Sequence, residues 1–153
     1  MDVNEKAPDF TLPDENGEPV TLSSFKGKPI VLFFYPRANT PGCTVEACGF
    51  RDHYGKLIRA GLTVLGISPD TSKAQKKFQE KYQLPYTLLA DANQEVAKLY
   101  DVLKEKNMYG KKVMGIERTT FLIAPDGGIA QVWRKVKPEG HADEVLAGAS
   151  AHK

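Results

Sequence analysis

A short apolar run that leads straight into a helix start is the feature that most constrains this fold. Residues 30–35 are rich in β-branched and aromatic side chains, which is typical of a buried strand. Thr40 then suits the N-cap of a helix, where its hydroxyl would add about 1 kcal/mol of stability. Pro41 suits the first helical position, because its missing N–H would have no partner there. We expect this helix to reach about residue 60 and to stop at Gly61. A buried strand that leads directly into a helix predicts an α/β fold.

Strand and helix signals continue to alternate along the rest of the chain. The expected elements are an N-terminal hairpin within 7–22, a helical turn at 23–27, a strand at 62–68, a helix at 72–82, an extended piece at 84–89, a helix from Asp91 or Asn93 to about 100, a turn-rich connection at 110–115, a hairpin of 118–124 and 128–135, and a helix at 141–149. This order predicts a mixed central β-sheet flanked by helices on both faces. No repeat or linker divides residues 1–153, so we expect a single domain.

Composition excludes several classes of function. The chain has 153 residues, of which 41% are hydrophobic and 26% charged, as in ordinary globular domains. A net charge of +2 without a Lys- and Arg-rich run gives no indication of nucleic-acid binding. No apolar run is long enough to cross a membrane. Residues 1–6 contain no signal-peptide core, and there are only two cysteines, so we expect a cytoplasmic protein with reduced thiols.

Cys43 is the residue best placed for chemistry. It follows Thr40 by three positions, so its sulfur would face unpaired backbone N–H groups and the positive end of the helix dipole. Both stabilise negative charge on sulfur, which a nucleophilic cysteine requires. The alternative is a structural cysteine, because free cysteines are often buried. Its place after Pro-Gly at a helix start favours the reactive role.

Cys48 lies five residues after Cys43 on the same predicted helix. In an ideal helix this spacing puts the Cα atoms about 8.7 Å apart and the side chains about 140° apart. A disulfide needs Cα atoms closer than about 7 Å, so the two thiols cannot bond while the helix is intact. If they do bond, the first turns must unwind, and Gly42 lowers the cost of unwinding. The alternative for Cys48 is a packing residue.

These positions resemble the active site of the peroxiredoxin family. Pro36, Thr40 and Cys43 match its pattern P-x-x-x-T-x-x-C, and the run 40–48 is similar to the bacterioferritin-comigratory, or Q-type, subgroup, whose second cysteine follows the first by five residues. Similar segments at 7–10, 66–68 and 118–123 extend the resemblance from about residue 3 to about residue 146. It implies a thioredoxin-like fold of the AhpC/TSA type with an extra N-terminal β-hairpin.

The resemblance also implies how the cysteines react. Cys43 would attack a peroxide and become a sulfenic acid, and Cys48 would convert that acid to an intramolecular Cys43–Cys48 disulfide. Arg118 would stabilise the developing charge, because its planar guanidinium can direct several donors at sulfur and oxygen. Without the resemblance, an arginine in a predicted strand is more often a surface residue, so the role of Arg118 comes from the resemblance.

Four further residues receive roles from the same resemblance. Thr40 would hydrogen-bond the bound peroxide, Pro36 would shield the site from water, and the backbone N–H groups of Gly42 and Cys43 would complete the peroxide cradle. Glu46 would orient the arginine, although an exposed glutamate in the first turns of a helix explains it equally well.

The implied substrates are hydrogen peroxide and organic hydroperoxides, and the implied reductant is thioredoxin or a similar dithiol. No cofactor or metal is expected, because sulfur carries the two-electron chemistry, and the Q-type resemblance favours a monomer. A zinc site of Cys43, Cys48 and His53 would have only three protein ligands, at spacings unlike those of common zinc sites, so we do not favour it. His53, His141 and His152 are otherwise expected on exposed helices or the tail.

Two other functions stay open. A thioredoxin-like protein thiol–disulfide oxidoreductase would usually have two residues between its cysteines rather than four, and it would have no evident use for Pro36 and Thr40. A redox-switched binding or chaperone module would instead expose Val45, Ala47 and Phe50 when the helix unwinds.

Overall fold

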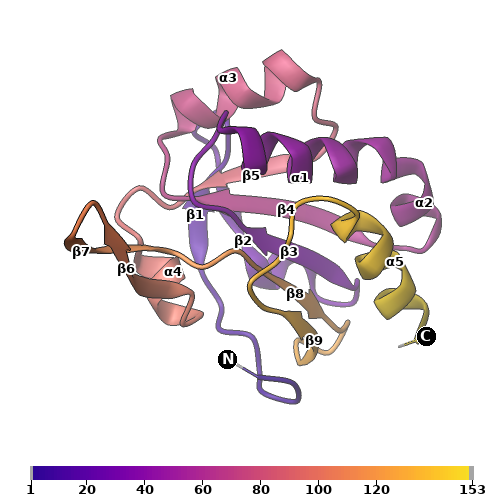
Figure 1. The fold of residues 1–153 in the computed structure, drawn as a ribbon. Helices are drawn as coiled ribbons and strands as arrows, with labels where there is room; N and C mark the ends of the chain where they lie inside the picture. The colour runs from indigo at the N-terminus through magenta and orange to yellow at the C-terminus, as the bar shows by residue number, and fades with distance from the viewer. Residues whose placement is uncertain (1, 152–153) are drawn as a thin grey trace.

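A five-stranded mixed β-sheet forms the centre of the computed structural model, which describes residues 2–151 (Figure 1). β3 (Ile30–Phe34) is the middle strand, parallel to β4 (Thr63–Ser68) and antiparallel to β8 (Thr119–Ile123). β5 (Thr87–Ala90) pairs with β4, and β9 (Ile129–Trp133) pairs with β8. The predicted mixed α/β sheet is confirmed.

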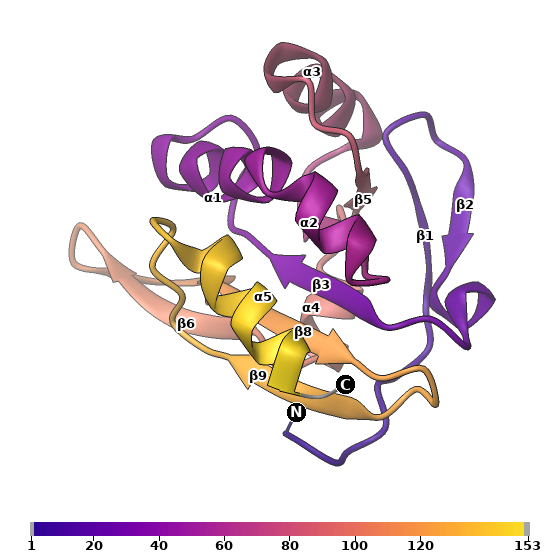
Figure 2. The same cartoon turned by 90° about the vertical axis from the view of Figure 1, so that its right-hand side faces the viewer.

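One face of this sheet is covered by helices. They are α1 (Pro41–Asp52), α2 (Tyr54–Arg59), α3 (Ser72–Tyr82) and α5 (His141–Ala151). Figure 2 shows α1, α2 and α5 on the same side of β3, β8 and β9. Their apolar side chains form one core with alternate residues that begin at Val31 in β3, as the two-residue period of a strand requires.

No helix among residues 2–151 is long and apolar enough to span a membrane.

The opposite face is covered by the N-terminal segment and a short helix. These are the hairpin of β1 (Thr11–Pro13) and β2 (Pro19–Thr21), the 3₁₀ turn η1 (Leu22–Phe25) and α4 (Glu95–Leu99). They pack against the other set of alternate β3 residues, Ile30, Leu32 and Phe34. The N-terminal hairpin and the helices on both faces are therefore confirmed.

The helix expected from residue 41 to about 60 is divided at His53, so this prediction was wrong in its middle. His53 has φ −101° and ψ 8°, outside helical geometry. Its backbone N–H donates to the carbonyl of Gly49 at 3.1 Å, and its ring Nδ1 lies 2.9 Å from the same oxygen. The chain turns there and resumes as α2, after which Gly61, at φ 82°, ends the helical region as predicted.

A second hairpin was missed by the sequence analysis. β6 (Leu103–Met108) and β7 (Lys111–Ile116) pair antiparallel where only a turn-rich connection was expected. Tyr109 and Gly110 form its tip with φ of 54° and 79°, as a two-residue primed turn requires. Because β7 is exposed along most of its length, it lacks the apolar alternation that marks a half-buried strand.

Candidate active site

The end of β3 brings the start of α1 and Arg118 together. In the antiparallel pairing of β3 with β8, Phe34 lies opposite Thr119. Arg118 directly precedes β8, so it lies beside the residues that lead out of β3 towards α1. This register explains how Arg118 and Cys43 meet although they are 75 positions apart in the chain.

Arg118 connects Cys43 and Glu46 through its two terminal nitrogens. Nη2 donates to the Cys43 sulfur at 3.4 Å, and Nη1 donates to Oε1 of Glu46 at 2.9 Å. The Arg118 side chain is 16% exposed and the Glu46 side chain is fully buried. Cys43, at 1% exposure, is also buried. The structure thus brings together three of the residues that the sequence analysis proposed for the site.

Burial and charge affect the pKa values of Glu46 and Arg118, the two partners of this ion pair, in different ways. Burial raises the pKa of Glu46 to about 7 and outweighs the opposing effect of the Arg118 guanidinium. Burial alone would lower the pKa of Arg118, but Glu46 and Cys43 together raise it. Arg118 therefore stays positively charged. Oε2 of Glu46 is buried and has no hydrogen-bond partner within residues 2–151, which fits a carboxyl group that is readily protonated.

Gly42 lies directly against the guanidinium. A Cβ atom on Gly42 would be 3.2 Å from Nη2 of Arg118 and 3.6 Å from Cγ of Pro138. The loop after β9 therefore borders the site, and the backbone N–H of Val136 donates to the carbonyl of Arg118 at 3.0 Å. The sequence analysis missed this loop, because no motif marks it.

Thr40 occupies the predicted N-cap position but does not cap the helix with its side chain. Its φ of −96° and ψ of 157° are those of an N-cap, and Pro41 follows at the first helical position. Its hydroxyl donates to the carbonyl of Arg37 at 2.9 Å instead of accepting from the first turn. The predicted capping bond was therefore wrong, because the side chain turns back into the loop. Pro36 is half-buried in the same loop.

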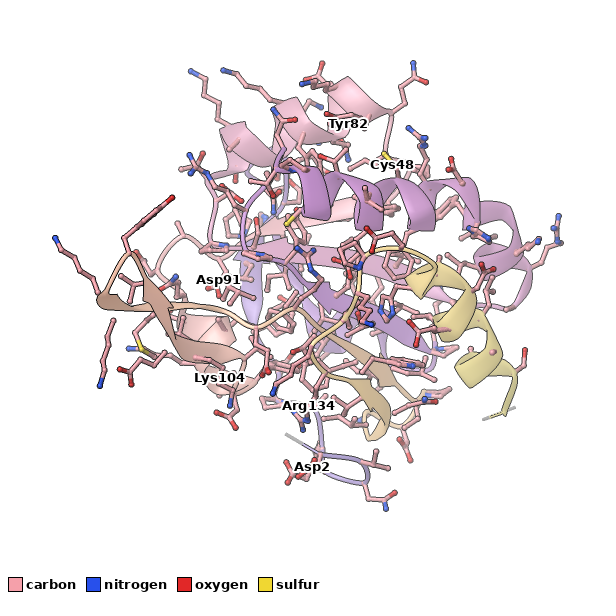
Figure 3. The ribbon with its side chains drawn as sticks, viewed as in Figure 1. Asp2, Cys48, Tyr82, Asp91, Lys104 and Arg134 are labelled. Atoms are coloured by element: carbon pink, nitrogen blue, oxygen red, sulfur yellow. The ribbon has the colours of Figure 1, made fainter. Side chains whose placement is uncertain are left out.

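Cys48 is a free, half-buried thiol on the intact helix. Figure 3 shows its sulfur on the upper edge of α1, below Tyr82 of α3. Burial raises its pKa, so the thiol form is favoured. Nearby, Nη1 of Arg51 donates to the carbonyl of Tyr82 at 2.8 Å and fixes this part of α1 to the end of α3. Cys43 is also free, so the structure describes the reduced protein.

The histidines differ from the exposed positions expected for them. His141 is 1% exposed, its Nε2 lies 2.8 Å from Oγ1 of Thr120, and its ring packs edge-on against Phe50 and Trp133. As the first residue of α5 it faces the sheet, and burial lowers its pKa. His152 lies outside the described residues.

His53 does not join the cysteines. Its Nε2 lies 3.0 Å from Oδ1 of Asp143, which connects the end of α1 to α5. Within residues 2–151, no three His, Cys, Asp or Glu side chains come together as metal ligands. The zinc hypothesis therefore has no structural support.

Comparison with known proteins gives consistent similarities over almost the whole chain. The AhpC/TSA family matches residues 3–132. A putative peroxiredoxin bcp of Coxiella burnetii is 53% identical over 146 residues, which cover 95% of this chain and 97% of that protein. Peroxiredoxin Bcp of Bacillus subtilis is 47% identical over 146 residues, which cover 95% and 93% of the two chains.

A solved structure extends the similarity to the fold. The bacterioferritin comigratory protein of Xanthomonas campestris, studied for its alkyl peroxide reduction activity, superposes with a TM-score of 0.93 at 41% identity. The match covers 99% of each chain.

Proposed function

This chain belongs to the AhpC/TSA family and is a thiol-dependent peroxidase of the Bcp type, and on that premise we propose that Cys43 is the residue that attacks the peroxide. One observation carries the assignment: a charged Arg118 donates to the Cys43 sulfur from one nitrogen and to Glu46 from the other. The sulfur attacks the nearer peroxide oxygen, the O–O bond breaks, and the departing hydroxide or alkoxide takes up a proton. Cys43 becomes a sulfenic acid.

Arg118 is proposed to stabilise the charge that develops on the leaving oxygen. Glu46 holds one end of the guanidinium, so the other end stays directed at sulfur. Gly42 lets the backbone come close to the guanidinium, because a side chain at this position would press on Nη2 of Arg118. Both Thr40 and Pro36 lie in the loop before α1. We propose that Thr40 contacts the peroxide and that Pro36 shields it from water.

Cys48 is proposed as the resolving cysteine. An ideal helix keeps the two Cα atoms about 8.7 Å apart, so the Cys43–Cys48 disulfide requires part of α1 to unwind. Three features weaken the start of α1: Gly42 lies in its first turn, Val45 is 44% exposed, and Thr40 provides no side-chain cap. These features support unwinding from the N-terminal end.

Peroxides are the substrates and a thiol compound is the reductant. More specifically, we propose that hydrogen peroxide and organic hydroperoxides both react, and that thioredoxin or a similar dithiol protein reduces the disulfide. Resolution within one chain supports a monomer that acts as a single domain, and we propose that it acts in the cytoplasm.

The test is the intact mass of three proteins after one equivalent of hydrogen peroxide. We expect the parent to lose two hydrogens, Cys48→Ser to gain oxygen, and Cys43→Ser to remain unchanged. A parent that stays reduced, or a Cys43→Ser variant that reacts as fast as the parent, would refute the assignment.

A further inference from the structure

We propose that Tyr86 is a positioning residue for the resolution step: its hydroxyl fixes the α1 backbone at Ala47, so that unwinding stops there and Cys48 keeps its place while Cys43 moves. The inference rests on the proposed roles of the two cysteines. It concerns a side chain outside the peroxide site, in the segment that leads into β5.

The contact between Tyr86 and α1 is short and buried. The phenol hydroxyl donates to the carbonyl oxygen of Ala47 at 2.6 Å. Tyr86 is 4% exposed and Ala47 is fully buried, so water does not compete for this bond. The Tyr86 ring packs edge-on against Phe33 and tilted against Tyr54. Burial raises the pKa of Tyr86 well above its usual value, so the hydroxyl remains a donor.

Two further contacts hold α1 beyond this point. Phe50 is fully buried and stacks on Phe33 with ring centroids 4.6 Å apart. Arg51 donates to the carbonyl of Tyr82 in α3 at 2.8 Å. Residues 47–51 are therefore fixed to β3, α3 and the segment before β5 at once.

The first part of the helix is held differently. Its two buried polar side chains, Cys43 and Glu46, both depend on Arg118. The thiolate that attacks a peroxide is negatively charged and attracts a guanidinium, whereas the sulfenic acid that it becomes is neutral. The contact to Arg118 weakens, whereas the bond from Tyr86 to Ala47 is unaffected. Unwinding should therefore proceed from residue 41 and end at Ala47, one residue before Cys48.

The position of Cys48 matters because of the reaction that follows. The Cys48 sulfur attacks the Cys43 sulfur, the S–S bond forms and the S–O bond of the sulfenic acid breaks. The hydroxyl leaves as water with the proton of the Cys48 thiol, so that the Cys48 sulfur is oxidised and the Cys43 sulfur is reduced. A thiol in a fixed place reacts at a high effective concentration, which falls when its backbone becomes mobile.

Tyr86→Phe tests this role without leaving a large cavity. Tyr100→Phe is the matched control, because the Tyr100 hydroxyl also donates to a backbone carbonyl, that of Pro8, at 2.6 Å. Rapid-quench mass spectrometry after mixing with hydrogen peroxide gives two rates for each protein. These are the second-order oxidation of Cys43 and the first-order formation of the disulfide. Thermal unfolding of both variants compares their stabilities.

In Tyr86→Phe, we expect disulfide formation to slow about tenfold, the size of one buried hydrogen bond, while Cys43 oxidation stays within about twofold. The share of Cys43 sulfinic acid at excess peroxide should rise accordingly. Tyr100→Phe should change neither rate, although it loses a comparable bond. Disulfide formation that is unchanged or faster in Tyr86→Phe would overturn the inference, as would an equal loss in both steps. A parent that oxidises Cys43 but forms no disulfide would instead refute the proposed role of Cys48.

Discussion

The two halves of α1 are held by different parts of the molecule. Within residues 41–46, Cys43 and Glu46 accept hydrogen bonds from Arg118, and Val45 is 44% exposed. Residues 47–52 are fixed by the hydroxyl of Tyr86, by the stacking of Phe50 on the sheet, and by Arg51 against α3. One helix thus joins a segment held by a reactive site to a segment held by the core.

This difference separates two requirements of the reaction. The attacking sulfur must be fixed beside a cation, but it must also be able to leave. The resolving sulfur must stay where the first one arrives. If the contact that holds the first half disappears on oxidation, the chemistry itself releases that half and leaves the second half in place.

The largest expected effect is on the free energy of unfolding, which a substitution in the second half of α1 should lower far more than one in the first half. Phe50→Ala removes a fully buried ring that stacks on Phe33, and should destabilise the fold by about 3–5 kcal/mol. Val45→Ala, at an exposed position in the first half, should change the free energy of unfolding by less than about 0.5 kcal/mol. Urea unfolding of both variants measures the difference. Similar losses would mean that the two halves are packed alike.

Arg118→Lys tests whether the first half depends on the geometry of the guanidinium. A lysine keeps the charge but cannot direct two separate nitrogens at Cys43 and Glu46. We expect the second-order rate of Cys43 oxidation to fall about 10²–10³-fold. Arg59→Lys, on the exposed side of α2, is the control and should keep the parental rate. A loss below about threefold in Arg118→Lys would mean that positive charge alone suffices.

Glu46→Gln tests the other end of the same contact. It should slow Cys43 oxidation about tenfold, because a neutral amide oxygen accepts from the Arg118 guanidinium less strongly than a carboxylate does. Exposed Glu80→Gln is the control and should keep the parental rate.

The pH dependence of stability gives a second readout for Glu46. Its pKa is about 7 in the folded state against a usual value of 4.5, so the folded state holds the proton more tightly. The stability of the parent relative to Glu46→Gln should therefore fall as pH rises from about 4.5 to about 7, and level off above that. Urea unfolding across this range measures it. A relative stability that instead rises with pH would contradict the raised pKa.

The smallest expected effect concerns the helix start. Thr40→Ala should cost less than about 0.5 kcal/mol, because the hydroxyl does not cap α1. Thr71→Ala, at the start of α3, should cost about 1 kcal/mol, because its oxygen accepts from the backbone N–H of Ala74 at 3.2 Å. The reverse order in thermal unfolding would show that Thr40 caps α1 in solution.

The central part of the fold could be predicted because its signals are local. The apolar run of β3 and the Thr-Pro start of α1 each follow from neighbouring residues. The hairpin of β6 and β7 could not be predicted in this way, because exposed strands show no apolar period. The break at His53 was also hidden, since it depends on one ring and its contacts with Gly49 and Asp143.

The sequence was enough to propose the residues of the candidate site, but not their geometry. The motif around Cys43 led us to propose it as the nucleophile, the resemblance led us to propose Arg118, and the structure places the two in contact. The burial of His141 and the bond from Tyr86 to Ala47 had no sequence signal, because both depend on contacts between elements that are distant in the sequence. The hydroxyl of Thr40 could either accept a hydrogen bond from the first turn of α1 or donate one to the carbonyl of Arg37. The sequence alone did not decide between these two bonds.

Amide hydrogen exchange in the reduced and disulfide forms, followed residue by residue by NMR, tests the division of α1 most directly. If residues 41–46 unwind, the amides of residues 44–50 lose the carbonyls four residues before them. The amides of Arg51 and Asp52 keep those of Ala47 and Cys48. We therefore predict faster exchange at 44–50 and unchanged exchange at Arg51 and Asp52 in the disulfide form. Faster exchange across the whole helix, or no change anywhere in it, would contradict the account.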